Sequence, residues 1–166
     1  EYAEKISFIQ NAVGAVPSPF DCYLLTRSIK TLSVRMKQHN ENAIAVSNYL
    51  SNHPKIEKVF FPGTDKRYKE IAEKQMDGFG GMMSFVIDSD INGVKTFLKN
   101  LNLFTLAESL GGVESLIEHP AIMTHASIDP SIREKLGISE TLLRISVGIE
   151  DVDDLISDLD QALSKI

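Results

Sequence analysis

The chain lacks the features that several broad classes of protein require. Its 166 residues include one cysteine, Cys22, so no internal disulfide can form, which agrees with a reducing compartment. Acidic residues outnumber lysine and arginine by 23 to 17, and a formal net charge of -6 provides no basic face for a phosphate backbone. No run of about 18 apolar residues and no basic-then-apolar leader is present. We therefore expect a soluble, cytoplasmic protein that binds neither nucleic acid nor membranes.

Short motifs for common chemistries are also missing. The sequence shows no nucleophile–base–acid set, no internal repeat and no low-complexity stretch. The glycine cluster at residues 78–81 does not follow a strand and open a helix, so it is interpreted as a turn that lets a strand start close to its neighbour. Glu118 and His119 with His125 come nearest to a metal site, but their order matches no helical zinc motif and Pro120 breaks the local geometry. We predict no metal centre.

The chain does have enough apolar material for a core. Hydrophobic residues make up 43% of the sequence, which excludes a disordered chain, and the length suits one domain or one domain with a short arm. The sequence has no initiator methionine and opens directly in a helical pattern. We therefore expect a fragment or a processed product.

Helical patterns dominate the first third of the chain. Apolar spacing predicts a helix over residues 4–13, and Ser18, followed by a proline and by Asp21, is a start signal for the next helix. The apolar stripe then runs to about residue 52, as one long helix or as two helices bent near residues 38–40. A helix of about 30 residues would span about 45 Å, so part of it is expected to pack against something outside this chain.

Three side chains in this region receive structural interpretations. Cys22 lies inside a predicted helix and is interpreted as a small buried apolar residue rather than a reactive thiol. His39 and His53 have no partners at metal-ligand spacing, so both are interpreted as surface or capping groups.

Strands and helices alternate in the rest of the chain. Short apolar runs between turn signals predict four strands, and amphipathic patterns with capping residues predict four more helices. This alternation favours an α/β fold, an α+β sandwich in which helices cover one face of a small sheet. The predicted strands are residues 56–61, 82–87, 103–106 and 141–147, and the predicted helices are residues 67–76, 91–100, 130–136 and 151–164.

The segment at residues 103–125 combines polar groups with glycines just past an apolar run. It holds Glu108 and Ser109, then Gly111 and Gly112, and neither helical nor strand periodicity continues through it. Chains often present functional groups in this way from a rigid support, although an ordinary irregular connection fits the same pattern.

Arg144 lies on the last predicted strand between small and apolar neighbours rather than in a run of charges. Alternation places Leu143, Ile145 and Val147 on one face and Arg144 on the other. A guanidinium fixed on a sheet suits the binding of a carboxylate through two parallel hydrogen bonds. A half-exposed arginine on an edge strand explains the pattern equally well.

Three ordered motifs carry a family resemblance that covers essentially the whole chain. Residues 107–127 read AESLGGVESLIEHPAIMTHAS, residues 14–24 read GAVPSPFDCYL ahead of a Lys-Thr-Leu motif at Lys30, and residues 143–150 read LRISVGIE. This set resembles the pyridoxal-phosphate enzymes of cysteine and methionine transsulfuration, and among them the cystathionine γ-lyases. The resemblance implies the small C-terminal domain of a fold-type I enzyme, with pyridoxal 5'-phosphate bound mainly by an N-terminal domain that is absent here.

The resemblance also implies roles for individual residues. Arg144 matches the arginine that binds the substrate α-carboxylate, and Ser109 matches a serine near the cofactor lysine. Glu108 matches an acidic position that faces the distal ammonium of cystathionine, and Thr124 resembles a residue that helps orient the arginine. Lys30 matches a position downstream of the cofactor lysine, so no catalytic residue is expected in this segment.

The implied domain organisation has three parts. Residues 1–17 would end the large cofactor-binding domain, residues 18–52 would form the interdomain helix or helix pair, and residues 53–166 would form the small domain. The implied enzyme is a homotetrameric cystathionine γ-lyase that acts on a small amino acid. The alternatives are γ-synthase or β-lyase activity within the family, and a non-catalytic module that binds partners or blocks assembly.

Overall fold

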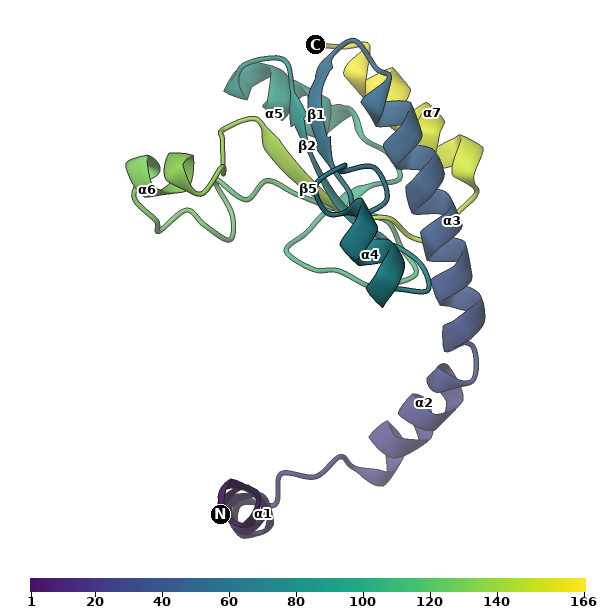
Figure 1. The fold of residues 1–166 in the computed structure, drawn as a ribbon, viewed down its shortest axis with the longest axis vertical. Coiled ribbons are helices and arrows are strands. Elements are labelled where there is room, and N and C mark those ends of the chain that lie inside the picture. Colours follow the sequence, from purple (N-terminus) through teal and green to yellow (C-terminus); the bar gives the residue numbers. More distant parts are fainter. The chain divides into compact units, whose positions relative to one another are not determined.

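The computed structural model describes residues 1–166 (Figure 1). These residues form two compact units, residues 1–34 and residues 35–166. The first unit contains helices α1 (Tyr2–Val13) and α2 (Pro19–Ile29), neither of which has a buried residue. The predicted start of α2 is confirmed, because Ser18 and Asp21 form a reciprocal capping box. Cys22 is exposed on α2. The prediction of a buried thiol is wrong because these two helices enclose no core of their own.

Helix α3 (Leu32–Ser51) is continuous through residues 38–40, so the alternative of two helices bent there is wrong. The interruption falls at residues 30–31 instead of residues 38–40. His39 is buried, with Nδ1 at 2.7 Å from the carbonyl oxygen of Val147, so its prediction as a surface or capping group is wrong. Asn42 is also buried and donates to the carbonyl oxygens of Gly148 and Glu150. These two polar side chains point into the interior because they make hydrogen bonds to backbone carbonyl groups just after the strand at residues 142–146.

The second unit is built on a five-stranded sheet in the order β1-β2-β5-β4-β3. Strands β1, β2, β5 and β4 pair antiparallel, whereas β3 is parallel to β4. The predicted α/β class is confirmed. The strands are β1 (Ile56–Phe60), β2 (Met82–Ile87), β3 (Thr105–Leu106), β4 (Leu116–Glu118) and β5 (Leu142–Ser146).

The predicted number of four strands is wrong because β4 was missed. This strand has only three residues and ends in a charged residue, Glu118. It is therefore too short and too polar for an alternating pattern to be recognised in the sequence. Strand β3 was predicted as a buried strand over residues 103–106. It is reduced to two exposed edge residues, and the buried side chain is that of Phe104 just before it.

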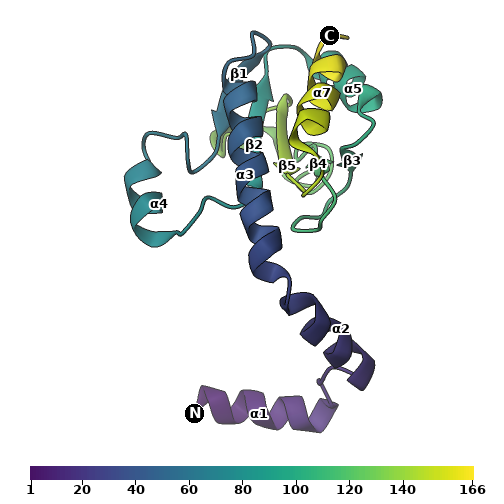
Figure 2. The same ribbon diagram turned by 90° about the vertical axis from the view of Figure 1, so that its right-hand side faces the viewer.

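One face of the sheet forms the hydrophobic core. The predicted inward residues of β5 are buried there together with alternate residues of β2, and helices α3, α5 (Ile91–Asn100) and α7 (Val152–Leu163) cover them (Figure 2). Asp90 and Asp151 cap α5 and α7 by accepting hydrogen bonds from first-turn amides. The core side chains of β2 and β5 are Met83, Phe85, Ile87, Leu143 and Ile145, with Val147 just after β5.

Two short helices lie outside this layer. Helix α4 (Lys69–Gln75) follows β1, and α6 (Pro130–Lys135) precedes β5 with Asp129 as its cap. Gly137 follows α6 with a positive φ of 76°, a conformation that commonly ends a helix. No helix of the chain has the length and apolar character needed to cross a membrane.

Candidate functional site

The face of the sheet opposite the core carries polar groups at its centre. Cross-strand pairing aligns Ser84 with Arg144 and Glu118 with Arg144, so these three side chains share one face. Strand β5 is the third of five strands in the sheet, which excludes the edge-strand explanation of Arg144. The arginine is therefore held between two neighbouring strands.

Arg144 and Glu118 form an ion pair on this face. The contact joins Arg144 Nη2 to Glu118 Oε2, with the arginine side chain 29% exposed and the glutamate side chain 1% exposed. A carboxylate this deeply buried requires a partner, because desolvation of an unpaired charge costs several kcal/mol. The guanidinium has five N–H donors and keeps contact with solvent, so it can bind a second carboxylate from the open side.

Thr124 joins the same array. Its hydroxyl donates to Glu118 Oε1, and its Oγ1 lies 2.8 Å from His125 Nδ1. A hydroxyl has one hydrogen to give, so the imidazole must be the donor in the second contact. The result is a chain of hydrogen bonds from His125 through Thr124 to Glu118, with the guanidinium of Arg144 on the other carboxylate oxygen.

The loop of residues 107–114, between β3 and β4, is attached to the end of β5. Gly111, with a φ of 78°, donates its amide to Ser146 Oγ at 2.8 Å. Closer to β4, Ser115 donates its amide and its hydroxyl to the carboxylate of Glu150 at 2.7 and 2.9 Å. Gly148 is needed at this crossing because an added Cβ would lie 2.3 Å from the carbonyl oxygen of Val113. The loop is therefore fixed beside the face that carries the arginine.

The predicted site residues are only partly brought together. Glu118 connects Arg144 with Thr124, whereas Glu108 and Ser109 are exposed on the loop and make no hydrogen bond to either of them. Sequence reasoning missed Glu118 as the partner of the arginine. The signal that could have found it was an acidic residue at the end of a short apolar run, since such a residue can pair with a basic side chain on the adjacent strand.

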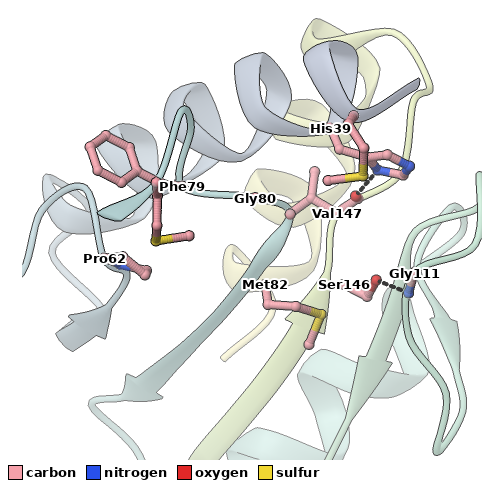
Figure 3. Close-up of a pocket in the computed structure, with 11 residues that line it drawn as sticks. His39, Pro62, Phe79, Gly80, Met82, Gly111, Ser146 and Val147 are labelled. Carbon is pink, nitrogen blue, oxygen red and sulfur yellow. Dashed lines mark hydrogen bonds between the residues drawn. The ribbon is translucent and has the colours of Figure 1, made fainter. Parts of the chain in front are cut away.

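A pocket of about 400 Å³ lies at the end of β5. Figure 3 shows Met82 and Ser146 beside the Gly111 loop, with Phe79 and His39 on other sides of the space. Met82 pairs with Ser146, so both belong to the face of the sheet that carries Arg144. The lining is mainly apolar, and it consists of Met36, His39, Pro62, Met76, Phe79, Gly80, Gly81, Met82, Gly111, Ser146 and Val147.

The glycine turn at residues 78–81 helps to form this pocket. A Cβ added to Gly81 would lie 2.9 Å from the carbonyl oxygen of Val147, so the predicted close approach of the strand to its neighbour is confirmed. The turn leads into β2 and not into a helix, so it does not provide the helix N-terminus on which phosphate groups commonly bind.

His119 does not join the array around Glu118. Its ring lies fully buried, with Nε2 at 2.8 Å from the carbonyl oxygen of Glu140. Burial lowers the pKa of this imidazole because desolvation penalises the charged form, and nearby Arg133 and Lys95 act in the same direction. No group of three or more histidine, cysteine, aspartate or glutamate side chains is arranged to hold a metal ion.

The sheet with helices on one face and an arginine–carboxylate pair on the other matches a domain of a fold-type I pyridoxal-phosphate enzyme. A crystal structure of cystathionine γ-synthase from Xanthomonas oryzae pv. oryzae matches it with a TM-score of 0.90 and 44% identity, over 98% of this chain and 42% of that one. The chain belongs to the Cys/Met metabolism PLP-dependent enzyme family, whose model matches residues 1–164. The family resemblance seen in the sequence motifs is confirmed.

The curated relatives carry more than one activity name. The chain is 55% identical over 166 residues to a cystathionine γ-lyase of Dictyostelium discoideum and 52% identical over 162 residues to a cystathionine β-lyase of Coxiella burnetii. It spans 43% and 42% of these proteins, so it corresponds to about two fifths of their length.

Proposed function

We propose that this chain is the C-terminal substrate-binding domain of a pyridoxal-phosphate-dependent cystathionine γ-lyase. The intact enzyme would cleave cystathionine to cysteine, 2-oxobutanoate and ammonia. The observation that carries the proposal is Arg144, an interior-strand arginine that keeps one side toward solvent while Glu118 holds the other. The 55% identity to the Dictyostelium γ-lyase supports the choice of activity.

Arg144 would bind the α-carboxylate of the substrate through two parallel hydrogen bonds. The Xanthomonas structure is a complex with aminoacrylate and cysteine, both of which carry such a carboxylate. A fixed carboxylate sets the direction of the Cα–H bond, which is how substrate-positioning groups contribute to rate. Thr124 would help to orient the arginine through Glu118.

Glu108 and Ser109 would act from the loop that Gly111 attaches to Ser146. Glu108 would pair with the distal ammonium of cystathionine, and Ser109 would support the cofactor lysine of the large domain. Their exposure leaves both side chains accessible to a ligand or to another domain.

The described residues fit the substrate side of a pyridoxal-phosphate site. They supply an arginine for a carboxylate but no phosphate cradle at the glycine turn, so residues outside this chain would hold the cofactor. When bound, the cofactor supplies an electron sink that allows a thiol to leave from the γ-carbon. This segment alone would be inactive. Residues 1–17 would end the large domain, residues 18–52 would link the domains, and the intact protein would be a cytoplasmic homotetramer.

Cystathionine γ-synthase and β-lyase activities are the second candidates, because relatives with these names match at 44% and 52% identity. An acidic Glu108 argues more strongly against the β-lyase than against the synthase. Product analysis separates the lyases: γ-cleavage of cystathionine releases cysteine and 2-oxobutanoate, whereas β-cleavage releases homocysteine and pyruvate.

Replacement of the arginine tests the proposed function. In the full-length enzyme, Arg144→Ala is expected to raise KM for cystathionine by about 100-fold, because a charge-assisted, bidentate contact is lost. Steady-state kinetics measure the effect. Arg67→Ala, which removes an exposed arginine paired with Asp65, is the control and should leave KM within about twofold of the parent value. An unchanged KM in Arg144→Ala would remove this residue from the substrate site.

A further inference from the structure

Glu118 is the most deeply buried charged group on the face that carries Arg144. Its side chain is 1% exposed, with Oε2 in the ion pair with Arg144 Nη2 and Oε1 accepting a hydrogen bond from the hydroxyl of Thr124. Apart from the ion pair, Oε2 is buried without a hydrogen-bond donor. Strand β4 places it directly opposite Arg144 in the register of the sheet. This carboxylate is therefore fixed by backbone pairing, by burial and by two side chains.

The arginine is the flexible member of the pair. An arginine side chain has several rotatable bonds, and ordering it costs roughly 2 kcal/mol of rotamer entropy. At 29% exposure, solvent alone would not hold its guanidinium in one plane. The contact from Nη2 to a rigid carboxylate fixes that plane before any ligand arrives.

We propose that Glu118 is a positioning residue for Arg144. It anchors one edge of the guanidinium so that the remaining N–H donors meet the substrate α-carboxylate in a bidentate geometry. Thr124 and His125 hold Glu118 in turn through the second carboxylate oxygen. This inference rests on the proposed role of Arg144 as the group that binds the substrate carboxylate. It adds Glu118 as the residue that sets the orientation of the guanidinium.

The length of the Glu118 side chain and its negative charge can be changed separately, so their effects on Arg144 can be told apart. Glu118→Asp keeps the negative charge but shortens the reach by one methylene, so the guanidinium must shift or lose its anchor. Glu118→Gln keeps the reach and an oxygen acceptor but removes the charge. A positioning role predicts the larger defect in Glu118→Asp, whereas a purely electrostatic role predicts it in Glu118→Gln.

The test uses the full-length enzyme, with alanine and alaninamide as competitive inhibitors. In Glu118→Asp the inhibition constant of alanine should rise about tenfold or more, because a misplacement of about 1 Å is costly at such sites. Alaninamide has no carboxylate, so its inhibition constant should change by less than about twofold. The matched control is Glu134→Asp, the same shortening at an exposed position of α6.

The outcomes separate this inference from the proposed function. If Arg144→Ala weakens alanine binding and Glu118→Asp leaves it within twofold, the positioning role is wrong and the role of Arg144 stands. If Arg144→Ala itself has no effect, the proposed function fails. Should Glu118→Asp not fold, Thr124→Val removes the hydroxyl that holds Glu118 and should weaken alanine binding about threefold or more, again without affecting alaninamide. Equal binding in Thr124→Val and the parent would then overturn the inference.

Discussion

Individual residues in this domain are held by contacts that link strands far apart in sequence. Glu118 is tolerated in the interior because Arg144 lies opposite it, and His119, the next residue, is buried with its Nε2 next to a carbonyl oxygen. These two adjacent residues are thus buried with different partners. The carboxylate lies against a cationic side chain, whereas the imidazole contacts an uncharged backbone carbonyl and its burial lowers its pKa.

His119 makes the stability of the domain depend on pH. Its pKa is lowered in the folded state from 6.5, so below pH 6.5 the unfolded chain binds a proton that the folded chain does not. The contribution is fully present above that value and is lost as pH falls through it. The free energy of unfolding should therefore decrease by up to about 1.4 kcal/mol per pH unit below pH 6.5.

Urea unfolding at pH 7.5, 6.5 and 5.5 measures this dependence. His119→Gln keeps an N–H donor for the carbonyl of Glu140 but cannot be protonated in this range, so its unfolding free energy should show a smaller slope. Identical slopes in the two proteins would show that His119 is not responsible.

At the scale of elements, capping residues determine where helices begin, and local composition limits which strands can be predicted from the sequence. Helix α5 has the bounds expected from its sequence, because Asp90 caps it and its apolar face is continuous. Strands β3 and β4 are short and pair side by side, so tertiary contacts rather than periodicity define them. The connection into β3 is held by α7, through Asp158.

Asp158 binds the backbone of this connection from the buried side of α7. Its carboxylate accepts from the amides of Asn102, Leu103 and Phe104 at 2.9, 2.8 and 3.2 Å. Burial alone would raise the pKa of this carboxyl, but these hydrogen bonds outweigh it and lower the pKa. Asp158→Asn should therefore lower the free energy of unfolding by about 1–3 kcal/mol, because charge-assisted hydrogen bonds weaken.

Urea unfolding at pH 7.5 tests this loss. Asp154→Asn, an exposed change in the same helix, is the control, and the loss there should not exceed about 0.5 kcal/mol. A loss of equal size in both variants would show that the three amide contacts do not stabilise the connection.

At the scale of the whole molecule, the chain contains one side of a proposed reaction site. The second unit has a core and a polar face with an arginine, whereas α1 and α2 have no buried residue. The chain spans about two fifths of its relatives. Activity is therefore proposed for the longer enzyme and not for this segment.

Cofactor attachment distinguishes the segment from the enzyme. The isolated 166-residue chain, mixed with pyridoxal phosphate and treated with borohydride, should retain no covalently bound cofactor that responds to cystathionine. The full-length enzyme should retain about one cofactor per chain, because the lysine would lie in the large domain. A substrate-responsive adduct on the isolated chain, detected by mass spectrometry, would contradict the proposal that the cofactor lysine lies in the large domain.

The sequence by itself determined the elements with strong local signals. The capped helices, the alternation of β5 and the family motifs all rest on patterns among residues that are close together in the chain. Only the tertiary structure decided that His39 is buried, that β4 exists and that Glu118 lies against Arg144. These features depend on which strands become adjacent, and the free energy of pairing a buried charge appears only when the partner strand is in place.

The segment at residues 103–125 shows both kinds of information. Its glycines and polar residues predicted a loop that presents functional groups, and the loop exists, tied to β5 through Gly111 and Ser146. The sequence did not show that the same segment contains a strand whose last residue, Glu118, fixes the arginine. That role arises from strand register, because a cross-strand pair has no signature in the order of residues along the chain.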